Sequence, residues 1–246
     1  SAGCTNIGIA SNHAPVHAAT DADADVEAAD VYDHIVNWTF AEPVLLGKYP
    51  ADELAALLPD RSTTTSRHRA TAGLVGINYY EPTLIAAPRE GEGSEACSRW
   101  TCRRACRSRR SHSTVTREPI SAGRSSRRAH GDPDDLPGPV RRGPSSVYIT
   151  ESGCSFHDPD PDAAGRVRDE RRIAYHADHL TAVRAAMDAG VDVRGYFVWS
   201  ILDNFEWAAG YRERFGLVHV DYDTLARTPK DSYRWFQSML AARKGA

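Results

Sequence analysis

Two groups of acidic side chains follow short apolar runs, and they are the residues best placed to do chemistry. Glu151 comes directly after the run 147–150, and Asp203 and Glu206 follow the run 196–199. Such a short apolar run predicts a strand buried in a parallel sheet, and these sheets bind ligands at the carboxyl ends of their strands. A partly desolvated carboxylate there suits a nucleophile or a general acid. The alternatives are a helix-capping or salt-bridged Glu151 and, after the second run, an ordinary polar surface loop.

Other segments supply the elements that would position these side chains. Two further apolar runs, at 6–10 and 74–80, predict strands. Helix patterns alternate with the four runs, and this order predicts an α/β fold with right-handed parallel crossovers. The predicted helices are one from Asp21 to around Pro43, and others at 51–58, 169–189 and 228–240.

The last two predicted helices carry clear start and stop signals. The helix at 169–189 should bury one apolar stripe and end before Gly190. The final helix should begin with Thr228 as its N-cap and Pro229 in its first turn, followed by Asp231. The apolar stripe consists of Ile173, Ala177, Leu180, Val183 and Met187.

Charge and cysteine content argue against several classes of protein. The 246 residues carry a net charge of −3, so the whole chain is no polycation that seeks nucleic acid or a membrane surface. The sequence has neither an apolar run of membrane-spanning length nor a basic-then-apolar secretory start. Five cysteines form no regular framework and favour a reducing compartment. We therefore expect a cytoplasmic protein without a membrane partner.

The segment 88–146 differs in composition from the rest of the chain. It holds thirteen arginines and three of the five cysteines, and it shows no apolar periodicity. Such a segment buries too little surface to offset its ordering entropy, so we expect disorder or poor packing. Three explanations compete: an Arg/Ser-type nucleic-acid linker, a metal site with an unusual C-x4-C-x3-C spacing, and translation in a shifted reading frame. The last is the interpretation that we favour.

Three segments resemble glycoside hydrolase family 1, the β-glucosidase group. They are VYITESG, LVGINYYEP and the long GYFVWSILDNFEWAAGYRERFGLVHVDYDTLARTPKDSYRWF. The resemblance covers roughly residues 3–60, 74–87 and 147–241. It implies a (β/α)8 TIM barrel and a retaining β-glucosidase-type hydrolase of carbohydrate metabolism that acts on a β-glycoside. It implies neither a cofactor nor a metal ion.

The same resemblance implies roles for individual residues. Glu151 matches the nucleophile of the family's I-T-E-N-G motif, with Ser152 in place of the Asn, and Tyr80 matches the tyrosine that hydrogen-bonds this nucleophile. Trp199 matches a strand-end tryptophan that is usually followed by a cis peptide bond, here to Ser200. Aromatic faces stack on a pyranose ring, and carboxylates and indole N–H groups form hydrogen bonds with its hydroxyls. This combination of residues fits a gluco- or galacto-configured sugar. The implied substrate-binding residues are Asn78, Trp199, Glu206, Trp207 and Phe215.

The family's acid/base glutamate has no counterpart in this chain. In the family it lies in a T-F-N-E-P motif at the end of the fourth strand, before the segment that resembles residues 6–10. Thr39-Phe40-Ala41-Glu42-Pro43 looks similar but follows the fifth-strand candidate, so we reject Glu42 as the acid. The four predicted strands then correspond to strands five to eight, and four strands cannot close an eight-stranded barrel.

We therefore expect residues 1–246 to form a single incomplete TIM-barrel domain that is inactive alone. One alternative is a non-catalytic remnant, and another is one half of a split enzyme that needs an N-terminal partner. A third and weaker hypothesis is nucleic-acid binding through Arg99–Arg128.

Overall fold

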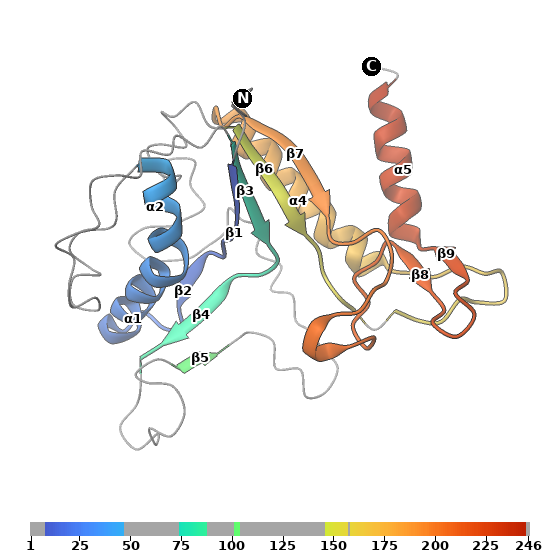
Figure 1. Ribbon diagram of the computed structural model, residues 1–246, viewed down its shortest axis with the longest axis horizontal. Helices are drawn as coiled ribbons and strands as arrows, with labels where there is room; N and C mark the ends of the chain where they lie inside the picture. The colour runs from blue at the N-terminus through green and yellow to red at the C-terminus, as the bar shows by residue number, and fades with distance from the viewer. Residues whose placement is uncertain (1–7, 47–73, 88–100, 104–145, 157, 245–246) are drawn as a thin grey trace, which may run out of the picture. The chain divides into compact units, whose positions relative to one another are not determined.

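Four hydrogen-bonded strands form the main sheet of the protein (Figure 1). The computed structural model describes residues 8–46, 74–87, 101–103, 146–156 and 158–244. The strands are β1 (Gly8–Asn12), β3 (Leu74–Tyr79), β6 (Ser146–Ser152) and β7 (Val193–Val198), in the order β1-β3-β6-β7. β1 and β3 pair in parallel, from Gly8 opposite Leu74 to Asn12 opposite Asn78. All four predicted strands are confirmed within a few residues.

The chain divides into two compact units, and each is described by itself. One comprises Ser1–Thr150 with Arg184–Gly195, and the other comprises Glu151–Val183 with Tyr196–Ala246. The sheet is parallel α/β as predicted, and in the described part of the chain it does not close into a barrel.

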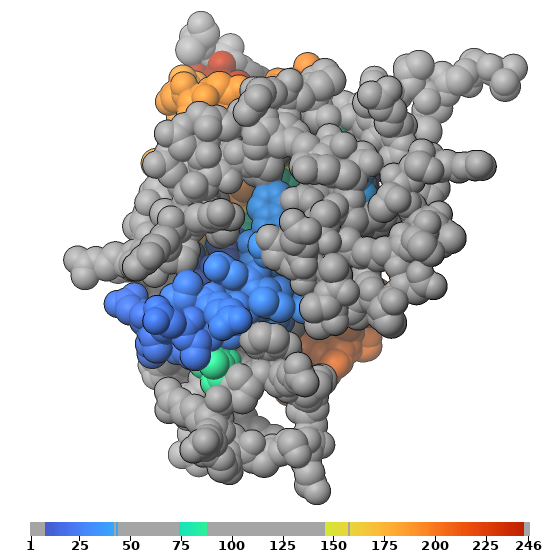
Figure 2. Space-filling view, turned by 90° about the vertical axis from the view of Figure 1, so that its left-hand side faces the viewer, coloured from blue at the N-terminus to red at the C-terminus, as the bar shows by residue number. Residues whose placement is uncertain are grey.

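A second sheet in the first unit escaped the sequence analysis. It joins β2 (Val16–Ala18), β4 (Thr83–Ala86) and β5 (Thr101–Arg103), with β2 parallel and β5 antiparallel to β4. Val16 and Ile85 pack with Ala28 and Ala29 of helix α1 (Asp23–Asp33) to form a small core. In Figure 2, residues from the N-terminal part of the chain form a blue area on the surface. β5 lies within the unusual segment 88–146, most of which lies outside the described residues.

The predicted helix from Asp21 runs further than expected. After α1 the chain makes one π-helical stretch, η1 (His34–Trp38), and continues as α2 (Thr39–Leu46) with Pro43 inside it. The predicted end around Pro43 is therefore slightly early, since α2 continues to Leu46 although an interior proline disfavours a helix. The segment that resembles the acid/base motif is therefore helical. The predicted helix at 51–58 lies outside the described residues.

Helix α4 (Glu170–Asp188) confirms the third predicted helix, and Gly190 follows it with φ of 97°. The predicted apolar stripe is only partly buried: Ile173, Ala177, Leu180 and Val183 are half-buried, and Met187 is 40% exposed. The most buried residues are Arg172, Tyr175, His176 and Ala182. The prediction did not include Arg172, which is buried because it pairs with the buried carboxylates of Asp158 and Asp169.

The last helix also begins later than predicted. Thr228 and Pro229 belong to strand β9 (Arg227–Pro229), which pairs antiparallel with β8 (Val218–Val220), so they do not cap the helix. Helix α5 runs from Asp231 to Lys244. Pro229 fits this place because a proline is tolerated in an edge strand.

Strand β7 differs from the prediction in its burial. Phe197 is 55% exposed, so the run 196–199 is not buried on both faces. β7 is the last strand in the sheet order, so in the described part of the chain one of its edges has no paired strand. None of the described helices has the length and apolarity that crossing a bilayer demands.

Candidate active site

Glu151 lies near the end of β6, with its side chain half-buried. In the first unit, Thr150, the residue before it, donates a hydrogen bond from Oγ1 to Oδ1 of Asn78, 2.6 Å away. Asn78 is on β3, and Tyr80 follows that strand directly. The sheet thus fixes Asn78 beside the residue that precedes Glu151. The hydrogen bond from Tyr80 to Glu151 stays a prediction.

The segment after Glu151 contacts the end of β7 within the second unit. The backbone N–H of Trp199 donates to the carbonyl of Ser152, with N and O 2.9 Å apart. Gly153 makes this approach possible, because a Cβ there would collide with the carbonyl oxygen of Trp199. The ring of Phe215 lies next to the same glycine. Three of the predicted site residues, Glu151, Trp199 and Phe215, thereby gather at one place.

A long loop from Trp199 to Gly216 carries most of the remaining predicted residues. The peptide bond between Trp199 and Ser200 is cis, which confirms the expectation from the family. The indole Nε1 of Trp199 donates to Oε1 of Glu206 at 3.1 Å. Trp207 begins a short 3-10 helix, η2 (Trp207–Ala209), with φ of 39°, and its side chain is 85% exposed. The loop therefore joins Trp199 to Glu206 and leaves Trp207 open to solvent.

The pKa of Glu206 is influenced by two other carboxylates. Desolvation raises the pKa of Glu206 above its usual value, and the charges of Glu213 and Glu151 raise it further. The hydrogen bond from Trp199 acts in the opposite direction. Glu151 and Glu206 thus lie within electrostatic range of each other. Two carboxylates and an indole N–H around one place can bind sugar hydroxyls and offer an oxygen nucleophile.

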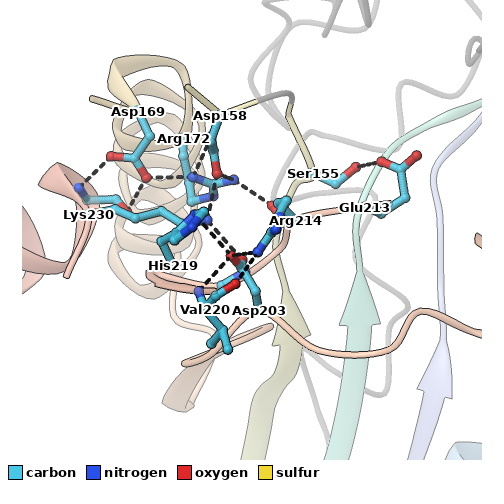
Figure 3. Close-up of polar contacts among 12 residues, drawn as sticks. Ser155, Asp158, Asp169, Arg172, Asp203, Glu213, Arg214, His219, Val220 and Lys230 are labelled. Atoms are coloured by element: carbon cyan, nitrogen blue, oxygen red, sulfur yellow. Dashed lines mark hydrogen bonds and ion pairs between the residues drawn. The ribbon is translucent and has the colours of Figure 1, made fainter. Parts of the chain in front are cut away.

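Sequence reasoning missed two residues at this site. Ser155 donates a hydrogen bond to Oε2 of Glu213, and Figure 3 shows this pair beside a larger group of charged side chains. Ser155 lies on the segment after Glu151, whereas Glu213 lies on the loop that carries Glu206. No motif marks either residue, although their shared neighbourhood follows once the two segments are known to pack together.

The nearby cysteine, Cys154, lies in an apolar cluster that disfavours its thiolate form. Cys154 is buried with Phe156 and Tyr175. Burial raises the pKa of its thiol to about 12, so the reactive thiolate is not populated near neutral pH. Among the described residues, no group of three or more His, Cys, Asp or Glu side chains could hold a metal ion.

Comparison with known proteins places this geometry in a family. Residues 3–245 match the model of glycosyl hydrolase family 1. Beta-glucosidase A of Enterobacter agglomerans is 34% identical over 241 residues, which cover 91% of this chain and 46% of that protein. A bifunctional beta-D-glucosidase/beta-D-fucosidase of Bifidobacterium breve is 32% identical over 232 residues, 88% of this chain and 49% of that protein.

Solved structures give the same result. The crystal structure of the AHE enzyme from Alicyclobacillus herbarius matches with a TM-score of 0.75 at 34% identity, covering 96% of this chain and 51% of that one. The chain thus spans about half the length of the relatives it matches.

Proposed function

The chain belongs to glycosyl hydrolase family 1, and from this premise we propose that it carries the nucleophile side of a retaining β-glucosidase-type active site. Glu151 is the proposed nucleophile. Trp199, Glu206 and Trp207 are the proposed sugar-binding wall, with Phe215 beside it. The substrate class is a β-glycoside, and the fucosidase activity in the name of one relative leaves the sugar open.

The observation that carries this proposal is the meeting of the Glu151 segment with the Glu206 loop. The Trp199 amide bonds the Ser152 carbonyl, and the Trp199 indole bonds Glu206. One residue thereby touches both the chain next to the nucleophile and the carboxylate proposed to bind hydroxyls. This arrangement supports a sugar ring bound across Trp199, with its anomeric carbon toward Glu151.

Retaining hydrolysis needs a second carboxyl group about 5–5.5 Å from the nucleophile, to protonate the leaving oxygen and then activate water. We propose that this group comes from protein outside the 246 residues. The four-strand sheet and the half-length match to relatives support that view. The chain alone then has no useful turnover. A non-catalytic remnant is the alternative.

A substrate with a good leaving group tests the nucleophile separately from the missing acid. A 2,4-dinitrophenyl 2-deoxy-2-fluoro-β-glucoside needs no proton on its leaving group, because the aryl oxide is a weak base. A carboxylate oxygen of Glu151 bonds to the anomeric carbon as the bond to the aryl oxygen breaks, and the aryl oxide leaves with the electron pair. The fluorine slows hydrolysis of the resulting ester by destabilising its oxocarbenium-like transition state.

The expected result is a covalent sugar on the peptide containing Glu151, detected by mass spectrometry after digestion. Glu151→Gln should give no label under the same conditions. Label on another residue, or equal label on both proteins, would refute the assigned nucleophile.

Turnover separates the remaining possibilities. The purified chain should release no more aryl alcohol from an ordinary aryl β-glucoside than Glu151→Gln does. Turnover that disappears in this variant would overturn the claim that the chain is inactive alone. Co-expression with an N-terminal half from a family 1 relative should restore turnover if the chain is one part of a split enzyme, and a remnant should gain none.

A further inference from the structure

Asp203 closes the base of the loop that carries Glu206. Its Oδ1 accepts a hydrogen bond from the backbone N–H of Gly216 at 2.9 Å, and its Oδ2 accepts one from Val220 at 3.3 Å. A Cβ on Gly216 would collide with the amide nitrogen of Asp203, so the two ends of the loop meet backbone to backbone. The side chain of Asp203 is fully buried. The carboxylate of Asp203 is therefore one of the acceptors that close this loop, together with backbone hydrogen bonds between its two ends.

Asp158 is a second buried carboxylate, and it lies on the segment that follows Glu151. Both of its oxygens accept from the guanidinium of Arg172, at 3.1 and 2.9 Å. Arg172 also donates to the backbone carbonyl of Arg214 at 2.6 Å, which lies in the loop that carries Glu206. Asp158 and Arg172 have almost no exposed side-chain surface. Each of the two segments of the proposed site thus has its own buried carboxylate.

Lys230 joins these two carboxylates. Its Nζ lies 2.6 Å from Oδ2 of Asp158 and 2.9 Å from Oδ1 of Asp203, and its side chain is fully buried. Lys230 sits between β9 and α5, outside both segments, and its backbone N–H donates to the carbonyl of Leu217 at 2.9 Å. Figure 3 shows the charged side chains gathered in one group. One ammonium therefore contacts a carboxylate of the segment that follows Glu151 and a carboxylate of the loop that carries Glu206, in addition to the contacts of Arg172, Trp199 and Ser155.

The charges in this group balance. Among the described side chains, Arg172, Arg214 and Lys230 face three acids, Asp158, Asp169 and Asp203. Burial and the neighbouring Arg214 lower the pKa of His219, so its imidazole adds no charge near neutral pH. Buried ion pairs are often no more stable than apolar replacements of similar volume. Stability alone is therefore a weak reason for such a group, whereas fixed geometry is a better one.

We propose that Lys230 is a positioning residue that sets the Glu206 loop against the nucleophile segment by bridging Asp203 and Asp158. The inference rests on the proposed function, since it assigns Lys230 a role in the same site. Lys230 itself touches no substrate. Its ammonium binds the carboxylates of Asp158 and Asp203. The other contacts of these two acids hold the backbone of the segments that carry Trp199 and Glu206.

The test compares two variants that break the bridge with one matched control. Lys230→Met keeps the length of the side chain and removes the ammonium, and Asp158→Asn keeps the shape of the acid and removes its charge. The control, Arg166→Met, breaks the ion pair of Arg166 with Asp231, the neighbour of Lys230, at 2.8 Å. That pair touches neither Asp158 nor Asp203.

Two measurements report on position. The first is hydrogen exchange of backbone amides in peptides covering residues 199–217, because a loosened loop opens more often. The second is the limiting rate of Glu151 labelling by the fluorinated glucoside at saturating concentration. Since a charge-assisted hydrogen bond is lost, both bridge variants should exchange about tenfold faster in this loop than the control and label at least about tenfold more slowly.

The outcomes separate the two proposals. If Lys230→Met and Asp158→Asn match Arg166→Met in both measurements, Lys230 is no positioning residue. If the unmodified chain takes no label on Glu151, the proposed nucleophile fails, and loop exchange alone then decides whether Lys230 positions the loop. If Lys230→Met does not fold, Asp158→Asn carries the test, because it preserves the shape of the buried group.

Discussion

The indole Nε1 of Trp199 donates a hydrogen bond to Oε1 of Glu206, 3.1 Å away. This bond opposes the desolvation and the charges of Glu213 and Glu151, all of which raise the pKa of Glu206. The indole N–H of Trp199 therefore favours the charged form of Glu206, which is the form that could accept hydrogen bonds in the proposed sugar site.

The first prediction concerns the charge of Glu206. Trp199→Phe should raise the pKa of Glu206 further, because the ring remains while the donor is lost. The measurement is a pH titration of the side-chain carboxyl by NMR, with the signal assigned from Glu206→Gln. Trp38→Phe is the matched control, since the Trp38 indole also donates to a carboxylate, Oδ2 of Asp33 at 2.7 Å. A Glu206 pKa that stays the same in Trp199→Phe would contradict the prediction.

The second prediction concerns the close contact at Gly153. Gly153→Ala places a methyl group against the Trp199 carbonyl, so the backbone must shift, and the free energy of unfolding should fall by about 3 kcal/mol. Gly165→Ala is the control. Gly165 has φ of 69° with open space around its Cα, so strain alone should cost about 1 kcal/mol. Urea unfolding followed by tryptophan fluorescence checks both, and equal losses would show that the contact at Gly153 relaxes easily.

The four main strands were predictable because their signals are local, whereas the roles proposed for the site residues come from the family resemblance and stay predictions. The apolar run before Glu151 and the apolar run before the loop with Glu206 can each be recognised from a few consecutive residues. Strand β2 gave no such signal, because three residues are too few for a period. The exposure of Phe197 depends on what packs over the face of β7, which no local pattern encodes.

The charged group around Lys230 was not predictable for a different reason. Arg172 is one of several polar residues on an amphipathic helix, and the sequence pattern predicts that the apolar stripe beginning at Ile173 is the buried face. The partners that make Arg172 a buried residue, Asp158 and Asp169, are only two of several nearby acids. Their pairing depends on the packing of distant segments. The sequence therefore shows which residues are charged but not which of them form ion pairs. Thr228 and Pro229 were misassigned likewise, because their partners lie in β8.

The third prediction contrasts two arginines of helix α4, Arg172 with buried acidic partners and Arg184 with an exposed one. Arg172→Met leaves the buried carboxylates of Asp158 and Asp169 without their shared partner, and it should lower the free energy of unfolding by about 3–5 kcal/mol. Arg184→Met removes an exposed pair with Asp188, and it should lower the free energy of unfolding far less, because water screens the two charges. Urea unfolding of the two variants at neutral pH gives both values. Similar losses would mean that the buried group reorganises to neutralise its charges.

The last prediction concerns acid sensitivity. His176 is fully buried, its Nδ1 lies 3.0 Å from the hydroxyl of Tyr196, and its ring packs against Phe236. Burial, with the charges of His179 and Arg172, lowers its pKa from 6.5 to about 3. Between these values the unfolded chain binds a proton on His176 that the folded chain does not. Stability therefore rises with pH across this window, and it is lost as pH falls from about 6.5 toward 3.

The expected slope from one such group is at most about 1.4 kcal/mol per pH unit. His176→Phe keeps a ring in the cluster and removes the titration, so stability should depend less on pH between 4 and 6.5, the remainder coming from groups such as His179, whose pKa burial also lowers. Trp235→Phe alters the packing against Phe236 without removing a titratable group, so its loss of stability should be the same at both ends of this range. Urea unfolding at several pH values provides the slopes. An unchanged slope in His176→Phe would mean that the buried imidazole takes up its proton in the folded chain.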